Sequence, residues 1–141
     1  MRTFHIFKIN REFTRLTRHV PYNLYMALNG IYKSSVKDVY AAYSLFDSMN
    51  EIFKKDEIKT ILKDMYSLDG YQNYGSVHTY HDYYNNESSK LIVHSSYLVL
   101  KTNKATSSFF KKLMMIPNLF VCDFENSDYF WLSDIKNLAL V

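Results

Sequence analysis

The sequence predicts an α+β fold: helices packed on a mostly antiparallel sheet of about five strands. Two observations lead to this class. Alternating apolar segments occur in hairpin-like pairs, and segments with helical spacing of apolar residues lie between them. A chain of 141 residues is long enough to bury a core without disulfides, so residues 1–141 are expected to form a single two-layer domain.

The first half of the chain is expected to contain one strand and four helices. Residues 3–9 alternate apolar side chains on two faces, as a strand does. Asn10 then stands where a helix N-cap belongs, and the apolar positions of the helix that follows are Phe13, Leu16 and Val20. Three further apolar stripes with helical spacing predict a helix from Pro21 that closes near Gly30, one capped by Ser34 or Ser35, and one capped by Asp56.

The second half is expected to contain two hairpins with a short helix between them. After a polar loop at 69–75, residues 77–84 and 90–101 predict the first hairpin. Ser107 predicts the helix cap. Residues 119–124 and 129–132 flank four turn-forming residues and predict the second hairpin, with the single tryptophan, Trp131, in the core.

Composition bounds the function classes. A net charge of +3 is far from that of a dedicated nucleic-acid binder, and no apolar run approaches the roughly 18 residues of a membrane span. The lone Cys122 fits a cytoplasmic protein and is expected in the core. The spacing of His78 and His81 on a strand places their rings on opposite faces, which disfavours a metal site, and no glycine-rich phosphate loop is present. No cofactor is therefore expected.

The best functional candidate visible in the pattern is an arginine stripe. Arg11, Arg15 and Arg18 share one face of the first helix, and guanidinium groups suit carboxylate or phosphate partners. The alternative is an ordinary solvated helix face. Tyr40 and Tyr43, one turn apart, either pack against the sheet or are presented as an interface anchor.

The two ends of the chain resemble a known family. Residues 10–13, Asn-Arg-Glu-Phe, follow the opening strand, and residues 120–124, Phe-Val-Cys-Asp-Phe, precede a short polar turn and then Tyr129–Leu132. This arrangement is similar to the SirA family, the sporulation inhibitors of replication of endospore-forming bacteria. After Leu132 the family tends to continue with Asn-Pro, where this chain has Ser133-Asp134.

The resemblance implies a non-enzymatic protein that binds the N-terminal domain of the replication initiator DnaA and blocks its action at the origin. The family's aromatic at the start of the first helix corresponds to Phe13. A second aromatic position falls at Thr17, and contacts from the following helical region map to Tyr40 and Tyr43. The partner-binding set is thus expected to comprise these residues with Arg11, Arg15 and Arg18, without direct nucleic-acid or membrane contact.

Two alternatives stay open. The first is a small nucleic-acid-binding module that uses the arginine stripe and surface tyrosines. The second is an acyl-transfer enzyme, which rests on fold analogy and lacks a catalytic constellation in the sequence.

Overall fold

The computed structural model describes residues 1–33 and 39–135. Its strands are β1 (Arg2–Ile9), β2 (Asn50–Glu51), β3 (Tyr71–Tyr74), β4 (Val77–Asp82), β5 (Glu87–Val93), β6 (Leu98–Thr102), β7 (Leu119–Asp123) and β8 (Asp128–Trp131). Its helices are α1 (Arg11–Thr17), α2 (Pro21–Tyr32), α3 (Val39–Met49), α4 (Lys55–Ile61) and α5 (Ser108–Leu113), with 3₁₀ turns η2 (Lys63–Met65) and η3 (Leu132–Asp134). In these described residues no helix has the length and apolar character to cross a membrane.

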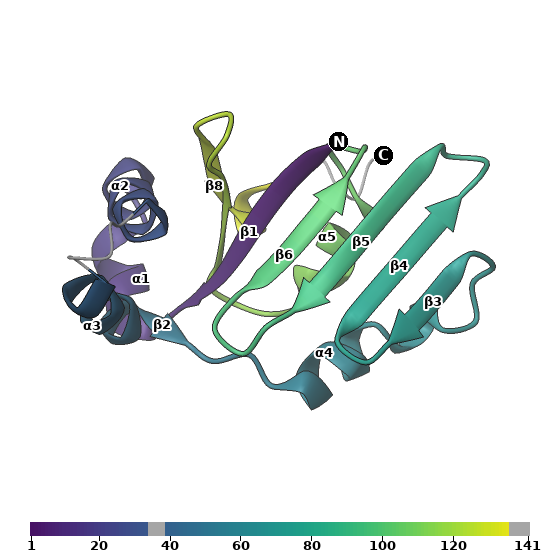
Figure 1. The fold of residues 1–141 in the computed structure, drawn as a ribbon, viewed down its shortest axis with the longest axis horizontal. Coiled ribbons are helices and arrows are strands. Elements are labelled where there is room, and N and C mark those ends of the chain that lie inside the picture. The colour runs from purple at the N-terminus through teal and green to yellow at the C-terminus, as the bar shows by residue number, and fades with distance from the viewer. Residues whose placement is uncertain (34–38, 136–141) are drawn as a thin grey trace.

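The strands form one sheet, in which every pairing is antiparallel (Figure 1). Their order is β3-β4-β5-β6-β1-β7-β8, and β2 pairs with the end of β1 through Lys8 and Ile9. The α+β class and the antiparallel sheet are therefore confirmed. The expected number of strands is wrong, because the sheet contains eight strands in the described residues where about five are predicted.

The three additional strands have local causes. The region 69–75, expected to be a loop, contains β3, which lies between Gly70 at φ 89° and Gly75 at φ 58°. Residues 90–101, expected to be one strand, divide into β5 and β6 at a turn closed by a hydrogen bond from the His94 amide to the Tyr97 carbonyl, 3.0 Å. The third, β2, is only two residues long, which is below the length at which alternation can be detected.

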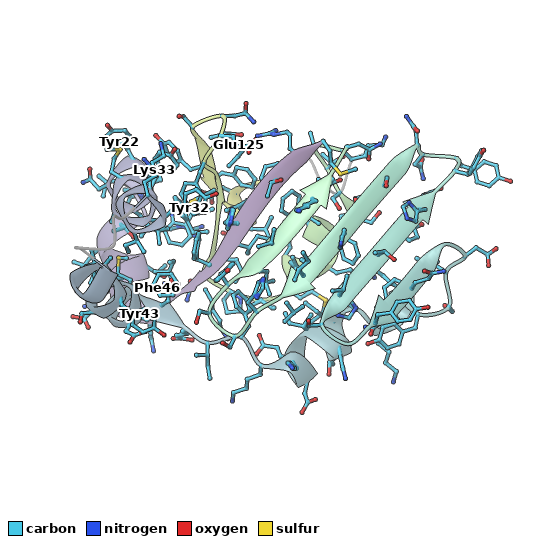
Figure 2. All side chains as sticks on the ribbon, in the orientation of Figure 1. Tyr22, Tyr32, Lys33, Tyr43, Phe46 and Glu125 are labelled. Atoms are coloured by element: carbon cyan, nitrogen blue, oxygen red, sulfur yellow. The ribbon has the colours of Figure 1, made fainter. Side chains whose placement is uncertain are left out.

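Helices α2 and α3 cover one face of the sheet at β1, β7 and β8. Trp131, 1% exposed, lies in this core cluster with Leu24 and Leu28 of α2 and Met49 of α3, which confirms its predicted burial. The rings of Phe7 on β1 and Phe46 on α3 are 5.9 Å apart, edge to face. Figure 2 shows Phe46 on the side of the helical layer nearest the sheet.

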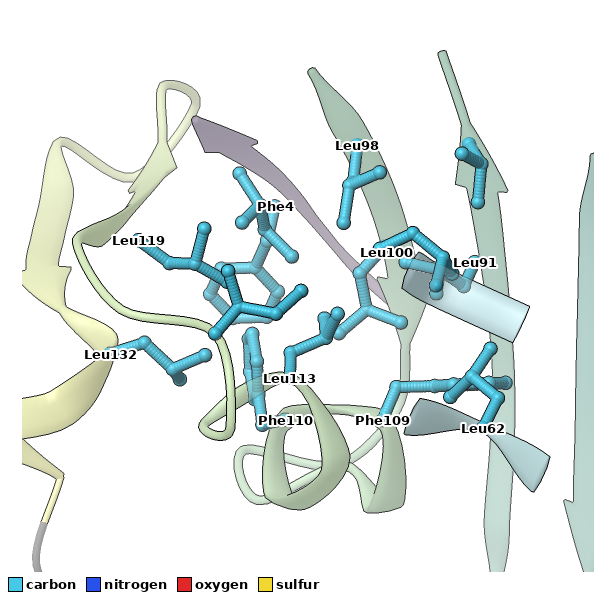
Figure 3. Close-up of a cluster of buried hydrophobic side chains, with 14 of the residues drawn as sticks. Phe4, Leu62, Leu91, Leu98, Leu100, Phe109, Phe110, Leu113, Leu119 and Leu132 are labelled. Atoms are coloured by element: carbon cyan, nitrogen blue, oxygen red, sulfur yellow. The ribbon is translucent and has the colours of Figure 1, made fainter. Parts of the chain in front are cut away.

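Helices α4 and α5 cover the opposite face. Phe109, Phe110 and Leu113 of α5 are fully buried against the strands (Figure 3). Phe4 of β1 meets Phe110 edge to face at 5.2 Å between ring centroids, and Leu62 after α4 adds to the same cluster. The sheet therefore has helices on both faces near β1, β7 and β8. The two-layer arrangement predicted from the sequence describes only the other half, where α4 and α5 cover one face of β3–β6.

Several helix boundaries follow the predicted signals and others do not. Asn10 and Ser107 are N-caps whose side chains accept backbone N–H groups, as predicted. Asp56 is not a cap, because α4 begins one residue earlier, at Lys55. Gly30 lies inside α2, which continues to Tyr32. The caps proposed at 34–35 lie outside the described residues.

A buried carboxylate holds α5 on the sheet. Glu87 of β5, 6% exposed, accepts hydrogen bonds from the hydroxyl groups of Ser89, Ser107 and Ser108 and from the Ser108 amide. Ser89 also shares a hydrogen bond with Thr102 of β6, 2.7 Å between the two hydroxyl oxygens. The network joins two strands to the start of the helix.

Candidate protein-interaction surface

The helix α1 is held at a fixed position next to β1 and the end of α3. The Asn10 side chain accepts the Phe13 amide at 2.9 Å and donates to the Ser48 carbonyl at 2.6 Å. The Asn10 amide donates to the Met49 carbonyl at 2.7 Å. These bonds fix the first turn of a helix that has only seven residues, which is too short to be stable without its neighbours.

Phe13 and Thr17, the two positions implied by the family resemblance, both lie on the inner side of α1. Phe13 is half-buried and packs against the α2–α3 core cluster, so it is less exposed than its expected role as an interface anchor suggests. Thr17 is also half-buried, and its hydroxyl donates to the Phe13 carbonyl at 2.6 Å. The exposed surface of α1 is therefore made mostly by other residues.

The predicted arginine stripe lines one hollow. Arg11, Arg15 and Arg18 surround an open volume of about 700 Å³ together with Glu12, Thr14, His19 and Asn118. Within the described part of the chain, Arg11 and Arg15 have no ion-pair partner. Arg18 is different: it donates to Asp134 at 2.9 Å and to Ser133 at 2.8 Å, and its guanidinium carbon lies 5.2 Å from the Trp131 ring centroid. Arg18 thus tethers α1 to η3, and two arginines remain available to a partner.

Tyr43 lies at a separate groove between α2, α3 and the sheet. The groove has a volume of about 340 Å³, and its aromatic walls include Tyr97 and the three residues labelled in Figure 2, Tyr32, Tyr43 and Phe46. Tyr43 is 63% exposed. Tyr40 belongs to α3, but its side chain lies outside the described side chains. No described residue lines both the arginine hollow and this groove, so the predicted site residues fall in two places.

Exposed apolar side chains gather on α1, on α2 and on the short link between them. Leu16 and Val20, which continue the apolar spacing expected for the first helix, are 64% and 44% exposed. The cause is that α1 ends at Thr17, with Phe13 as its contact with the core. Tyr22 and Met26 of α2 are 56% and 46% exposed. Their spacing of four residues, away from the buried Leu24 and Leu28, is a signal that could have identified a second apolar face.

Two histidines and the single cysteine have pKa values shifted by burial. Burial lowers the pKa of His5, which contacts the rings of Tyr32 and Phe124 at 5.0 and 5.3 Å between centroids. Burial, and then the charge of Lys59, lowers the pKa of His78, whose Nδ1 is 2.6 Å from the Tyr71 hydroxyl.

Burial also raises the pKa of the Cys122 thiol, which keeps it protonated, and the predicted core position of this cysteine is confirmed. His78 is buried and His81 is exposed on the opposite face of β4, as predicted. Among the residues described, no three His, Cys, Asp or Glu side chains form a group that could hold a metal ion.

Comparison with known proteins gives no further guide to this surface: no protein-family model and no curated protein matches the chain.

Proposed function

We propose that this protein is a non-enzymatic, cytoplasmic inhibitor of DNA replication initiation that binds the N-terminal domain of the initiator DnaA during sporulation. The family resemblance at both ends of the chain supplies the partner. The observation that carries the proposal is that large apolar side chains are exposed on α1 and α2 beside an arginine-lined hollow. An apolar patch with a charged rim is typical of a protein interface.

The proposed mechanism is stoichiometric occupation of the initiator domain. Leu16 and Val20 would lose their exposed apolar surface on binding, and Arg11 and Arg15 would pair with acidic side chains of the partner at the rim. Phe13 has a supporting role in this arrangement, because its packing against the core fixes the orientation of α1. Tyr43 lies on α3 at the groove and would contact the partner at the edge of the same helical region.

The test is titration calorimetry of the purified protein with the isolated N-terminal domain of DnaA. Leu16→Ala removes an exposed side chain and is expected to weaken binding by about 1–2 kcal/mol with little change in stability. Arg15→Glu is expected to slow association and weaken binding further. Lys54→Glu is the matched control, because this exposed lysine precedes α4 and lies away from α1.

Phe13→Ala is less selective than the sequence alone suggests. The resemblance predicts a loss of at least about 2 kcal/mol of affinity without a comparable loss of stability. Because Phe13 packs against the core, the structure predicts that both quantities fall. No association of the wild-type protein with the initiator domain at micromolar concentration would contradict the proposed function.

The nucleic-acid alternative on the arginine stripe makes a different prediction. Binding through Arg11 and Arg15 to phosphates would weaken steeply with salt, in proportion to the number of phosphates neutralised. An interface with an apolar centre depends less on ionic strength, so a salt titration separates the two functions.

A further inference from the structure

The strands β3, β4, β5 and β6 leave one face of the sheet without a helical layer. Leu91 on β5 and Leu100 on β6 point toward α5 and are fully buried. Because side chains alternate along a strand, Lys90 and Lys101 point to the opposite face. Figure 1 shows this open face toward the viewer, with α5 behind the strands.

Two lysines face each other at the centre of this open face. Lys90 and Lys101 are directly paired across β5 and β6, and both are exposed. The same row continues to Thr79 on β4 and Thr3 on β1. Among the described residues neither lysine has an ion-pair partner. Like charges in direct opposition disfavour strand pairing, and an anion bound between them would remove that repulsion.

The charge of the open face has one sign. Asp82 and Glu87, the acidic residues of these four strands, lie on the other face: Asp82 shares the side of Tyr80, and Glu87 binds α5. The outward positions of β3–β6 therefore carry lysine, histidine and neutral side chains. The positive charge of this face favours an anionic ligand, although the whole chain has a net charge of only +3.

Two exposed tyrosines lie at the end of the hairpin formed by β4 and β5, the strand that carries Lys90. Tyr83 and Tyr84, at the tip of the β4–β5 hairpin, are fully exposed, at 99% and 101% of the reference surface. The tip is fixed, because Asp82 accepts the Tyr84 amide at 3.0 Å and Asn103 donates to the Asn86 carbonyl at 2.9 Å. These bonds hold the backbone of the tip, so the loop itself loses little conformational entropy when a ligand binds.

We propose that the open face of β3–β6 binds single-stranded nucleic acid. Lys90 and Lys101 contact the phosphates, and the tyrosines at the hairpin tip stack with bases, which are accessible only when unpaired. This surface is distinct from the α1 surface, and the proposal does not depend on the initiator as partner. It also departs from the sequence expectation of no direct nucleic-acid contact, because the distribution of charge on one face is decided by the fold.

The test is fluorescence anisotropy of the purified full chain with a labelled oligothymidylate of about 12 nucleotides, within the usual site size of such surfaces. The double variant Lys90→Glu, Lys101→Glu is expected to bind at least about tenfold more weakly. For this variant the slope of log K against log salt concentration is expected to be shallower by about 1.4, which corresponds to two lost phosphate contacts. The matched control, Lys54→Glu with Lys55→Glu, makes the same change in net charge at the start of α4 and is expected to bind as the wild type does.

A second variant tests stacking apart from charge. Tyr83→Ser with Tyr84→Ser is expected to weaken binding at least about fivefold and to leave the salt dependence unchanged. Both positions are fully exposed, so the variant is expected to fold, which its circular dichroism spectrum and melting temperature would check.

Four results would overturn the proposal. The first is no binding of the oligonucleotide by the wild-type chain at low salt, and the second is an equal loss of affinity in the control variant. The third is a loss of affinity in an Arg11→Glu, Arg15→Glu variant while the Lys90→Glu, Lys101→Glu variant binds normally, and the fourth is displacement of the oligonucleotide by a polyglutamate peptide at equal charge concentration. The third result would place nucleic acid on α1, and the fourth would indicate an acidic protein segment as the ligand.

Discussion

The buried carboxylate of Glu87 gives the sharpest prediction about stability. Glu87→Ala removes the acceptor of four hydrogen bonds, whose donors are Ser89, Ser107 and both the amide and the hydroxyl of Ser108. It also leaves a small cavity between β5 and α5. The change therefore weakens the attachment of the start of α5 to the sheet, and with it the anchor of the Phe109–Leu113 segment that fills the core.

The magnitude can be worked from the network. A hydrogen bond to a charged group contributes about 1.5–3 kcal/mol, so four such bonds set an upper limit far above the real loss. Ser108 is half-buried and can bind water in the variant, and Ser107 and Ser89 keep the hydrogen bond between their hydroxyls. A net loss of about 3–5 kcal/mol is expected, because buried donors left without an acceptor cost about 1–3 kcal/mol each. Glu87→Gln keeps the shape but brings an NH₂ group against donors, and about 1–2 kcal/mol is expected.

Urea unfolding at pH 7, followed by circular dichroism, measures these losses. Glu125→Ala at the exposed β7–β8 turn is the control, with an expected change of less than about 0.5 kcal/mol. If Glu87→Ala lies within about 1 kcal/mol of the wild type, the carboxylate does not hold α5, and the reasoning from the network is wrong.

Three further predictions concern the core, the titration of a buried histidine and a backbone contact. Trp131→Ala is expected to lower the free energy of unfolding by about 3–5 kcal/mol, because the side chain is 1% exposed. Since the variant has no tryptophan, its unfolding is followed by circular dichroism. Because burial lowers the folded-state pKa of His5, the unfolded chain binds its proton first as the pH falls below about 6.5, and stability is lost on acidification. His5→Phe should therefore reduce the stability difference between pH 7.5 and pH 5.5, and an unchanged difference would contradict the assignment. Gly70→Ala is expected to cost at least about 2 kcal/mol, since φ is 89° and a Cβ would overlap the His81 carbonyl, whereas Gly75→Ala, with φ 58° and open space around the Cβ position, should cost about 1 kcal/mol in the same urea assay.

The fold was predictable where one sequence signal decides one local structure. Asn10 and Ser107 cap helices because their side chains reach nearby backbone amides, and this reach depends only on neighbouring residues. The alternation in 3–9 and the largely apolar run in 119–124 predict strands, which are β1 and β7 in the structure. The division of 90–101 into two strands was missed because Leu91, Val93, Tyr97 and Val99 keep an alternating spacing across the turn.

The candidate surface was predictable only in part. The arginine stripe follows from helical spacing, and the structure does bring its three members around one hollow. The exposure of Leu16 and the partial burial of Phe13 did not follow, because both residues are apolar and the spacing of the helix does not say where the core lies. The ion pair that occupies Arg18 joins residues more than one hundred positions apart, which is beyond any local pattern.

The sequence by itself determined most of the local elements, the α+β class and the aromatic character of the core, because these depend on propensity, capping and alternation between near neighbours. The tertiary structure alone decided which faces are covered. Two helical layers lie on opposite faces of the sheet and cover different sets of strands. Apolar residues of α1 and lysines of β5 and β6 therefore remain in contact with solvent. The physical reason is that burial depends on long-range packing, and the exposed faces that can bind partners are those that packing leaves uncovered.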